Sequence, residues 1–180
     1  MGKDQYVAFL RGINLGNRNI KMQELGAAFS SLGFSGVQTI LATGNVVFES
    51  GYNPDPQIIS RALWERFGFE VGVILRSVDQ LEALVDANPF GSHADQKDVK
   101  LYHTLCATEI GTALEGVKDQ PGDFSIAMIK SHDYFSIAYR QPSGRFGAGL
   151  DKLERLFKGQ LITTRNWNTM LKIIKKARTK

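Results

Sequence analysis

The sequence predicts an α+β protein made of two ferredoxin-like βαββαβ units in tandem, followed by a C-terminal helix. In each unit a mixed or antiparallel sheet would carry its helices on one face. Three observations lead to this prediction. Short β-rich runs alternate with segments of helical periodicity, the same order of elements occurs twice in 180 residues, and the polar segment 89–98 separates the two halves.

The elements of the first half follow from apolar periodicity and from turn residues. We expect Asn19 to cap the first helix, Gly33 to end it, and Gly44-Asn45 to form a hairpin turn. Asp55-Pro56 supplies an N-cap and a first-turn proline for the second helix. The predicted strands are 6–10, 37–41, 46–48 and 71–75, and the predicted helices are 22–32 and 56–67.

A further helix leads out of this first half. Ser77 and Gln80 have the spacing of a capping box, and the helix must end before Asn88-Pro89 because a proline disfavours helical backbone at the preceding residue. We therefore expect three segments. They are an N-terminal unit over residues 1–88, a linker over 89–98 and a C-terminal unit over 99–180.

The second half repeats the order of elements. The predicted strands are 99–107, 124–129, 134–139 and 161–163, and the predicted helices are 109–117 and 150–157. In the last helix one apolar stripe consists of Trp167, Met170, Leu171 and Ile174, opposite Lys172, Lys175 and Lys176. We expect this helix to dock through the stripe with its lysines exposed.

Cysteine count and hydropathy exclude several classes of protein. Cys106 is the only cysteine, so no intramolecular disulfide can form. The longest apolar runs fall far short of the roughly 20 residues that span a bilayer. The N-terminus has no apolar stretch followed by a small-residue cleavage site. We expect a cytoplasmic protein with no membrane segment.

Charge is unevenly distributed along the chain. The net charge is +4, but residues 155–180 hold eight basic and no acidic side chains, so the rest of the chain is slightly acidic. A cationic C-terminus fits contact with a polyanion such as nucleic acid. A solvated helix face is the alternative interpretation.

The connection after the first strand has the composition of an anion-binding loop. Residues 11–18 contain two glycines, two asparagines and two arginines, and glycine lets backbone amides approach a phosphate or carboxylate. The spacing matches neither the phosphate loop of nucleotide hydrolases nor the dinucleotide fingerprint. A tight turn that simply needs glycine is the alternative. The candidate ligand-binding residues are Arg11, Gly12, Asn14, Gly16 and Arg18.

A second polar segment, Thr163–Thr169, surrounds one tryptophan with hydrogen-bonding side chains. Its arginine can bind a phosphate in a bidentate manner, and its tryptophan can stack on a planar ring. The alternatives are that Thr164 or Asn166 only caps the last helix and that Trp167 packs in the core. The candidate ligand-binding residues are Thr164, Arg165, Asn166, Trp167 and Asn168.

Two further features bear on chemistry. Gly44 and Asn45 join the site if their turn borders it, and hairpin geometry alone is the alternative. His103 alternates with apolar residues, which predicts an inward-facing or edge histidine rather than a general base. The three histidines and one cysteine have no metal-ligand spacing, so we expect no metal ion and no cofactor.

Five motifs of this chain resemble those of a bacterial family, domain of unknown function 1697, and the resemblance covers essentially the whole chain. The motifs are Ala8–Gly16, Lys21-Met22-x-x-Leu25, Thr43–Phe48, Asn88–Phe90 and Thr163–Thr169. Thr43 stands where the family often has serine, so a hydroxyl is kept. The resemblance implies two ferredoxin-like units. It implies no activity, ligand or catalytic residue.

Three functional hypotheses remain open at this point. The first is a binding module for an anionic or phosphate-bearing ligand, nucleotide or nucleic acid, where the Arg11–Arg18 loop, the Gly44-Asn45 turn and the Thr163–Thr169 segment converge. The second is an enzyme that acts on a small phosphorylated or nucleotide-like substrate in the same pocket, with chemistry supplied by the substrate or by a metal ion. The third is an interaction protein whose motifs are purely structural and whose sheet edges pair into a homodimer.

Overall fold

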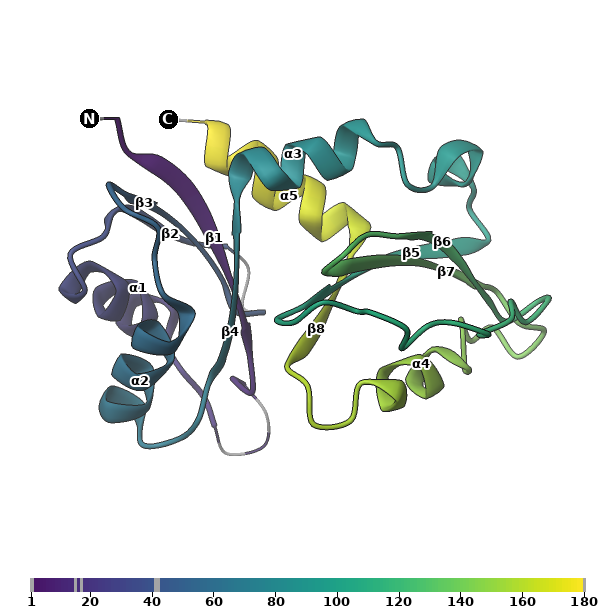
Figure 1. The fold of residues 1–180 in the computed structure, drawn as a ribbon, viewed down its shortest axis with the longest axis horizontal. Helices are drawn as coiled ribbons and strands as arrows, with labels where there is room; N and C mark the ends of the chain where they lie inside the picture. The colour runs from purple at the N-terminus through teal and green to yellow at the C-terminus, as the bar shows by residue number, and fades with distance from the viewer. Residues whose placement is uncertain (1, 15, 17, 41–42, 180) are drawn as a thin grey trace. The chain divides into compact units, whose positions relative to one another are not determined.

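The structure, a computed structural model, describes residues 2–14, 16, 18–40 and 43–179 (Figure 1). The chain divides into two compact units, Met1–Ala83 with Ile173–Lys180, and Leu84–Lys172. We call these the first unit and the second unit. The domain boundary at residues 89–98 stays a prediction, because compactness does not show which segments fold independently.

The first unit contains the predicted βαββαβ order. Its elements are β1 (Asp4–Arg11), α1 (Met22–Ser31), β2 (Ser35–Ile40), β3 (Asn45–Ser50), α2 (Pro56–Phe67) and β4 (Gly72–Ser77), followed by α3 (Val78–Asp86). The strands form an antiparallel sheet in the order β2-β3-β1-β4. Helices α1 and α2 cover one face of this sheet, which confirms the ferredoxin-like topology (Figure 1).

Local hydrogen bonds confirm two of the predicted helix starts. Asp55 Oδ1 accepts from the amide of Gln57 at 2.8 Å at the start of α2. Ser77 and Gln80 form the reciprocal capping box of α3, with distances of 2.9 and 3.1 Å. These contacts join residues two or three positions apart, so the sequence alone contains the information for them.

The start of α1 differs from the prediction. Lys21 occupies the N-cap position of α1 and its side chain makes no capping hydrogen bond, so the prediction that Asn19 caps this helix is wrong. Asn19 lies three residues before the first helical residue and is exposed, too early to reach the unpaired amides of the first turn. The predicted C-terminal end is confirmed, since Gly33 follows the C-cap with a φ of +85°.

The core of the first unit lies between the sheet and these two helices. The rings of Phe29, Phe34 and Phe48 form its centre, with centroid distances of 4.4 Å for Phe34–Phe48 and 5.4 Å for Phe29–Phe48. Leu25 of α1 and Leu63 of α2 are fully buried against them. Burial of such apolar side chains is the main force that holds the helices on the sheet.

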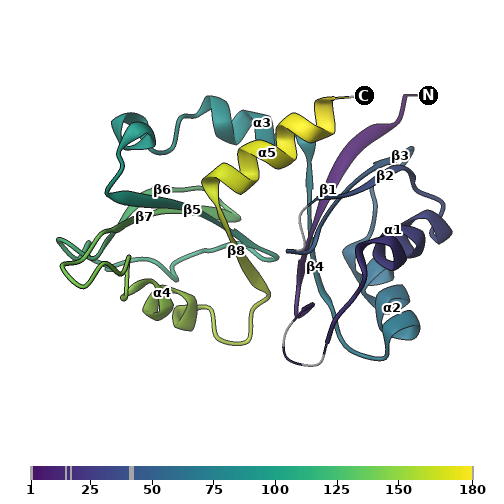
Figure 2. The same ribbon diagram turned by 180° about the vertical axis from the view of Figure 1, so that it is seen from behind.

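The second unit repeats the same strand order. Its elements are η1 (Gly91–Asp95), β5 (Val99–Cys106), β6 (Phe124–Ile129), β7 (Asp133–Tyr139), α4 (Leu150–Leu156) and β8 (Ile162–Asn166), followed by α5 (Trp167–Arg178). The antiparallel sheet has the order β6-β7-β5-β8, equivalent to that of the first unit. Figures 1 and 2 both show α4 on one face of this sheet. The predicted tandem of ferredoxin-like units is confirmed.

Residues 109–117 are a series of turns, so the helix predicted there is wrong. Amide-to-carbonyl bonds over three residues, such as Ala113 to Ile110 at 3.1 Å and Val117 to Leu114 at 3.2 Å, replace the helical pattern. Gly111 and Gly116 have positive φ values of 53° and 76°, which a right-handed helix does not allow. Apolar spacing alone did not reveal these left-handed positions.

The last helix docks through a different apolar stripe from the one predicted. Its buried residues are Trp167, Met170, Ile173 and Ala177. Leu171 is 39% exposed, because it lies off the axis of this stripe, and Ile174 is half-buried. The predicted exposure of Lys172, Lys175 and Lys176 is confirmed.

Helix α5 ends in the first unit on a cluster of polar contacts. The side chain of Gln5 in β1 donates to the carbonyl of Ala177 at 2.9 Å. Arg178 contacts Glu82 through two hydrogen bonds of 2.8 and 2.6 Å and Asp79 through one of 2.5 Å. The Arg178 guanidinium lowers the pKa of Glu82. No helix in the described ranges has both the length and the hydropathy needed to cross a membrane.

Candidate functional site

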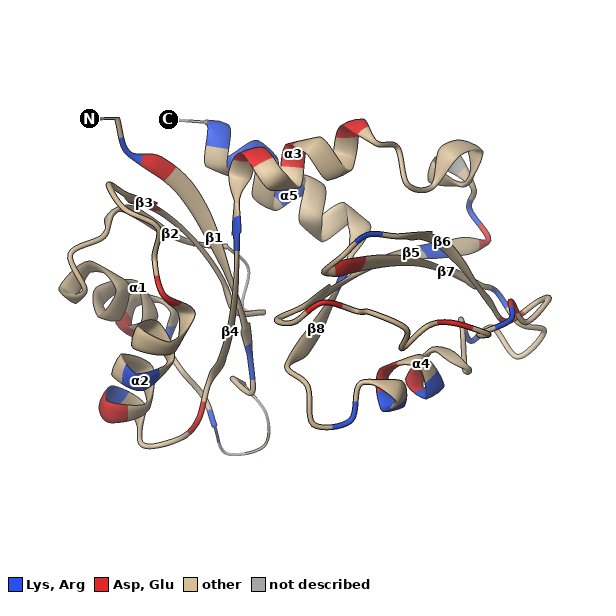
Figure 3. Cartoon of the chain, in the orientation of Figure 1, with Lys and Arg blue, Asp and Glu red and all other residues tan. Residues whose placement is uncertain are grey.

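The connection between β1 and α1, which we call the cationic loop, consists of residues 11–21. Arg11, Arg18 and Lys21 are its basic residues, and no acidic residue occurs between Arg11 and Gln23. All three basic side chains are exposed. Figure 3 shows Lys and Arg recurring along this connection. The loop is therefore a local centre of positive charge on the first unit.

Three described residues of the cationic loop have left-handed backbone conformations. Gly12, Asn14 and Gly16 have φ values of +89°, +56° and +57°. Left-handed residues that flank another residue, as Gly12 and Asn14 flank Ile13, are typical of backbone nests, in which neighbouring N–H groups converge on an anion. At Gly12 a Cβ would also lie 3.3 Å from the carbonyl oxygen of Glu70, so the absence of a side chain lets the two segments approach.

Two of the three predicted site segments meet in the first unit. The amide of Leu10 donates to the carbonyl of Gly44 at 2.8 Å. Gly44 is buried with a φ of +75°, and a Cβ there would lie 2.6 Å from Cδ1 of Ile13. Asn14 Oδ1 accepts from the amide of Ile20 at 3.1 Å and so holds the far side of the loop. The hairpin turn thus contacts the start of the cationic loop and helps to hold its backbone in place.

Asn45 has a structural role in this support. Its side chain is fully buried, and Nδ2 donates to Thr43 Oγ1 at 2.8 Å and to the Ile40 carbonyl at 3.2 Å. Both contacts lie within the hairpin. They favour the alternative interpretation, in which Asn45 holds the turn in shape.

The third predicted segment, Thr163–Thr169, belongs to the second unit, and several of its side chains have structural partners. Thr164 shares a 2.8 Å hydrogen bond with Thr104 and donates to Glu154 Oε1 at 3.0 Å. Asn166 Oδ1 accepts from the amide of Asn168 at 3.0 Å, as a helix cap does.

Trp167 packs in the second unit. The indole is 8% exposed and meets the rings of Phe90 and Phe135 edge-on, at centroid distances of 5.3 and 5.8 Å. Burial of this kind agrees with the alternative that Trp167 is a core residue of the last helix.

Arg165 is held within its own strand. Nη1 donates to Thr163 Oγ1 at 2.6 Å and to the carbonyl of Thr164 at 3.1 Å. Burial lowers the pKa of Arg165 to about 10, which still leaves the guanidinium charged at neutral pH. The convergence of Arg165 with Arg11 stays a prediction.

A buried hydrogen bond between a histidine and a carboxylate in the second unit was not predicted from the sequence. His103 Nε2 lies 2.8 Å from Asp133 Oδ1, and the histidine is fully buried. The imidazole stacks on Phe135 with a centroid distance of 4.5 Å and an interplanar angle of 13°. The prediction of an inward-facing histidine is confirmed. Among the described residues, no group of three or more His, Cys, Asp or Glu side chains could hold a metal ion.

The sheet registers relate residues of the two units to each other. Arg76 lies opposite Val7 in the first sheet, as Arg165 lies opposite His103 in the second. Arg76 Nη1 also donates to the carbonyl of the preceding residue, Leu75, at 2.9 Å. Arg165 makes the equivalent bond, so each unit places an arginine at the same position before its terminal helix.

The same registers pair the buried polar residues. Asn45 lies opposite Phe9 in the first sheet, and Asp133 lies opposite Leu105 in the second. Both residues begin the third strand of their unit and both are buried. An alignment of the two halves by strand position would have indicated Arg76 and Asp133 as candidates beside the residues chosen from composition.

Comparisons with known proteins place the chain in a family. A family model described as "Protein of unknown function (DUF1697)" matches residues 3–129. The solved structure of a conserved bacterial protein, SP0830 from Streptococcus pneumoniae, is similar with a TM-score of 0.76 and 20% identity, over 99% of this chain and 100% of that chain. At this identity the likeness concerns the fold alone. No protein with a curated description matches the chain significantly. The chain belongs to the family described as protein of unknown function DUF1697.

Proposed function

We propose that this protein is a binding module for an anionic, phosphate-bearing ligand and that the cationic loop is its primary contact. The observation that carries the proposal is the presence of three left-handed residues, 12, 14 and 16, within a stretch that holds three basic residues and no acid. Backbone amides would bind the anion, and the arginines would supply charge and paired N–H donors.

Several described residues of the loop are held by contacts within the protein. The Leu10–Gly44 hydrogen bond fixes its start, and the Asn14–Ile20 hydrogen bond fixes its far side. Arg18 lies over the ring of Phe69, with 5.4 Å between Cζ and the ring centroid, which restricts the directions the guanidinium can take. A site that is ordered in advance loses less conformational entropy on binding.

The other two hypotheses receive less support from the described residues. Lys21 is the only Asp, Glu, His, Cys or Lys in residues 11–21, so the loop offers few groups for acid–base or nucleophilic catalysis. A homodimer through sheet edges needs regular edge strands. Of the four edge strands, β2 and β6 have register shifts that discourage pairing with another chain, whereas β4 and β8 have regular registers and leave this hypothesis to β4 and β8 alone.

Calorimetric titration with inorganic pyrophosphate at low salt tests the proposal. We expect saturable binding that weakens as salt is added. Replacement of Arg11 or Arg18 by Ala should weaken binding by about 10- to 150-fold if each guanidinium donates to the anion. Arg155→Ala, at an exposed arginine of α4 in the second unit, is the matched control and should leave the Kd unchanged.

Two results would overturn the proposal. One is the absence of pyrophosphate binding at low salt by a folded protein. The other is equal affinity of the wild-type protein and the Arg11→Ala/Arg18→Ala double variant. The inclusion of Thr163–Thr169 in the same site remains part of the hypothesis, and Arg165→Ala tests it in the same titration.

A further inference from the structure

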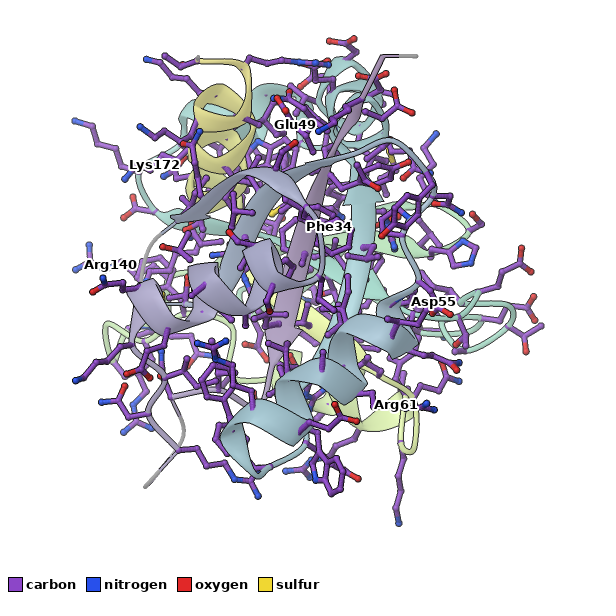
Figure 4. The ribbon with its side chains drawn as sticks, turned by 90° about the vertical axis from the view of Figure 1, so that its left-hand side faces the viewer. Phe34, Glu49, Asp55, Arg61, Arg140 and Lys172 are labelled. Atoms are coloured by element: carbon purple, nitrogen blue, oxygen red, sulfur yellow. The ribbon has the colours of Figure 1, made fainter. Side chains whose placement is uncertain are left out.

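A groove of about 360 Å³ lies in the first unit between helix α2 and the start of strand β4. Its lining residues are Gln57, Ser60, Arg61, Trp64, Glu70, Val71 and Gly72. Figure 4 labels Arg61, which projects outward from α2 at this side of the unit. A volume of this size is in the range of small-molecule sites in proteins.

The groove adjoins the cationic loop. Arg11 is the cross-strand partner of Gly72, so the end of β1 and the groove wall are one strand spacing apart, about 5 Å. Gly12 approaches the carbonyl of Glu70, and Arg18 lies over Phe69. Residues 69–72 therefore separate the groove from the cationic loop and contact both.

Trp64 offers an open aromatic surface in this groove. The side chain is 53% exposed and lies on one stripe of α2 with Gln57 and Arg61. A single exposed aromatic residue on a helix is common. Trp64 lines a groove that shares a wall, residues 69–72, with the cationic loop. A ligand that used both features would have an anionic end and a flat, neutral end.

The groove is built on a rigid base. Ser60 Oγ donates to the carbonyl of Val71 at 2.6 Å and ties α2 to the start of β4. The amide of Gly68 donates to the Trp64 carbonyl at 2.8 Å and closes the helix behind the indole. Ile59 and Leu63 are fully buried on the opposite side of α2. The indole is thus presented from a fixed helix.

The charges of the groove and of the cationic loop determine which end of a ligand is favoured at each place. The groove has one basic residue, Arg61, and one acidic residue, Glu70, both exposed, so its formal charge is balanced. The cationic loop has three basic residues and no acidic one. An anionic group is favoured at the loop and a neutral, flat group against the indole. The side-chain amide of Gln57 can both donate to and accept from the edge of such a group.

We infer that the ligand is a free nucleotide whose phosphate binds the cationic loop and whose base stacks on Trp64 in the groove. This inference rests on the proposed function, because it assigns the phosphate to the same loop. It adds a second contact that a simple phosphate cannot use. Stacking of a base on an aromatic side chain strengthens binding by about 5- to 150-fold.

Calorimetric titrations with adenosine monophosphate and ribose 5-phosphate test the inference, because the two probes share a sugar and a phosphate and differ in the base. We expect the nucleotide to bind about 5- to 150-fold more tightly. Trp64→Ala should make the affinities for the two probes equal. Trp64→Phe should keep most of the preference for adenosine monophosphate. Tyr52→Ala is the matched control, because Tyr52 is an aromatic residue of the same unit with 61% exposure and lies outside the groove.

The outcomes separate the base contact from the phosphate contact. Equal affinities of the two probes for the wild-type protein, or an unchanged ratio in Trp64→Ala, would overturn the base contact while the phosphate site stands. Binding of a single-stranded oligonucleotide without binding of the mononucleotide would also overturn the inference that the ligand is a free nucleotide. If neither probe nor pyrophosphate binds, the proposed function itself fails. Thermal unfolding of each variant shows that lost binding is not lost folding.

Discussion

Gly44→Ala tests whether the hairpin turn really supports the cationic loop by close contact. Gly44 has a φ of +75°, and a Cβ there would lie 2.6 Å from Ile13 Cδ1 and 3.2 Å from Leu10 Cβ. A left-handed conformation costs a non-glycine residue about 1–2 kcal/mol. The steric overlap adds about 1–3 kcal/mol. We therefore expect Gly44→Ala to lower the free energy of unfolding by about 2–5 kcal/mol.

Gly33→Ala isolates the conformational part of this effect. Gly33 has a φ of +85°, and nothing lies within 4 Å of its Cβ position. We expect this variant to lose only about 1–2 kcal/mol. Urea unfolding followed by circular dichroism measures both variants, at the same protein concentration and temperature.

Ile13→Val provides the second control, because it removes the Cδ1 atom that an alanine at position 44 would overlap. The double variant Gly44→Ala/Ile13→Val should be more stable than the sum of the two single effects, with a coupling energy of about 1–3 kcal/mol. If Gly44→Ala is no more destabilising than Gly33→Ala, or if the double variant shows no coupling, the close contact between turn and loop does not exist as described.

Three further predictions concern local contacts. Ser77→Ala should lower the free energy of unfolding by about 1 kcal/mol because the capping box of α3 is lost, and urea unfolding measures it, with no change expected if the cap is dispensable. His103→Leu leaves Asp133 buried without the imidazole, so a loss of about 3–5 kcal/mol is expected, most of which Asp133→Asn in the same background should restore. Burial raises the pKa of Tyr134 from 10.0 to about 12. The unfolded state then binds fewer protons than the folded state between these pH values, so stability should fall as pH rises above 10, and Tyr134→Phe should flatten that part of the stability–pH curve.

The two units of this chain place comparable residues at equivalent positions of their sheets. Arg76 and Arg165 occupy the same place in the fourth strand and each donates to the carbonyl of the residue before it. The polar residues that begin the third strands, Asn45 and Asp133, differ in chemistry, and both are buried. The cationic loop and the Trp64 groove both lie in the first unit. The two units therefore share an architecture and differ in the residues available to a ligand.

Much of the fold was determined by the sequence alone, because its signals act over short distances. The Asp55 cap, the Ser77–Gln80 capping box and the left-handed Gly33 each depend on residues within four positions of one another. The alternating β-rich runs and helical stripes then leave few ways to bury the apolar faces. The strand order and the tandem of ferredoxin-like units follow from these local signals, while the helix predicted at residues 109–117 does not form.

Only the tertiary structure decided which distant residues meet. Sheet register brings His103 to Asp133, thirty positions along the chain, and Gly44 to Leu10. The β4 edge brings Glu70 and Gly72 to Arg11 and Gly12, next to a tryptophan that the helical pattern of α2 did not single out. Such contacts depend on the packing of whole elements, and spacing along the sequence carries no direct measure of that packing.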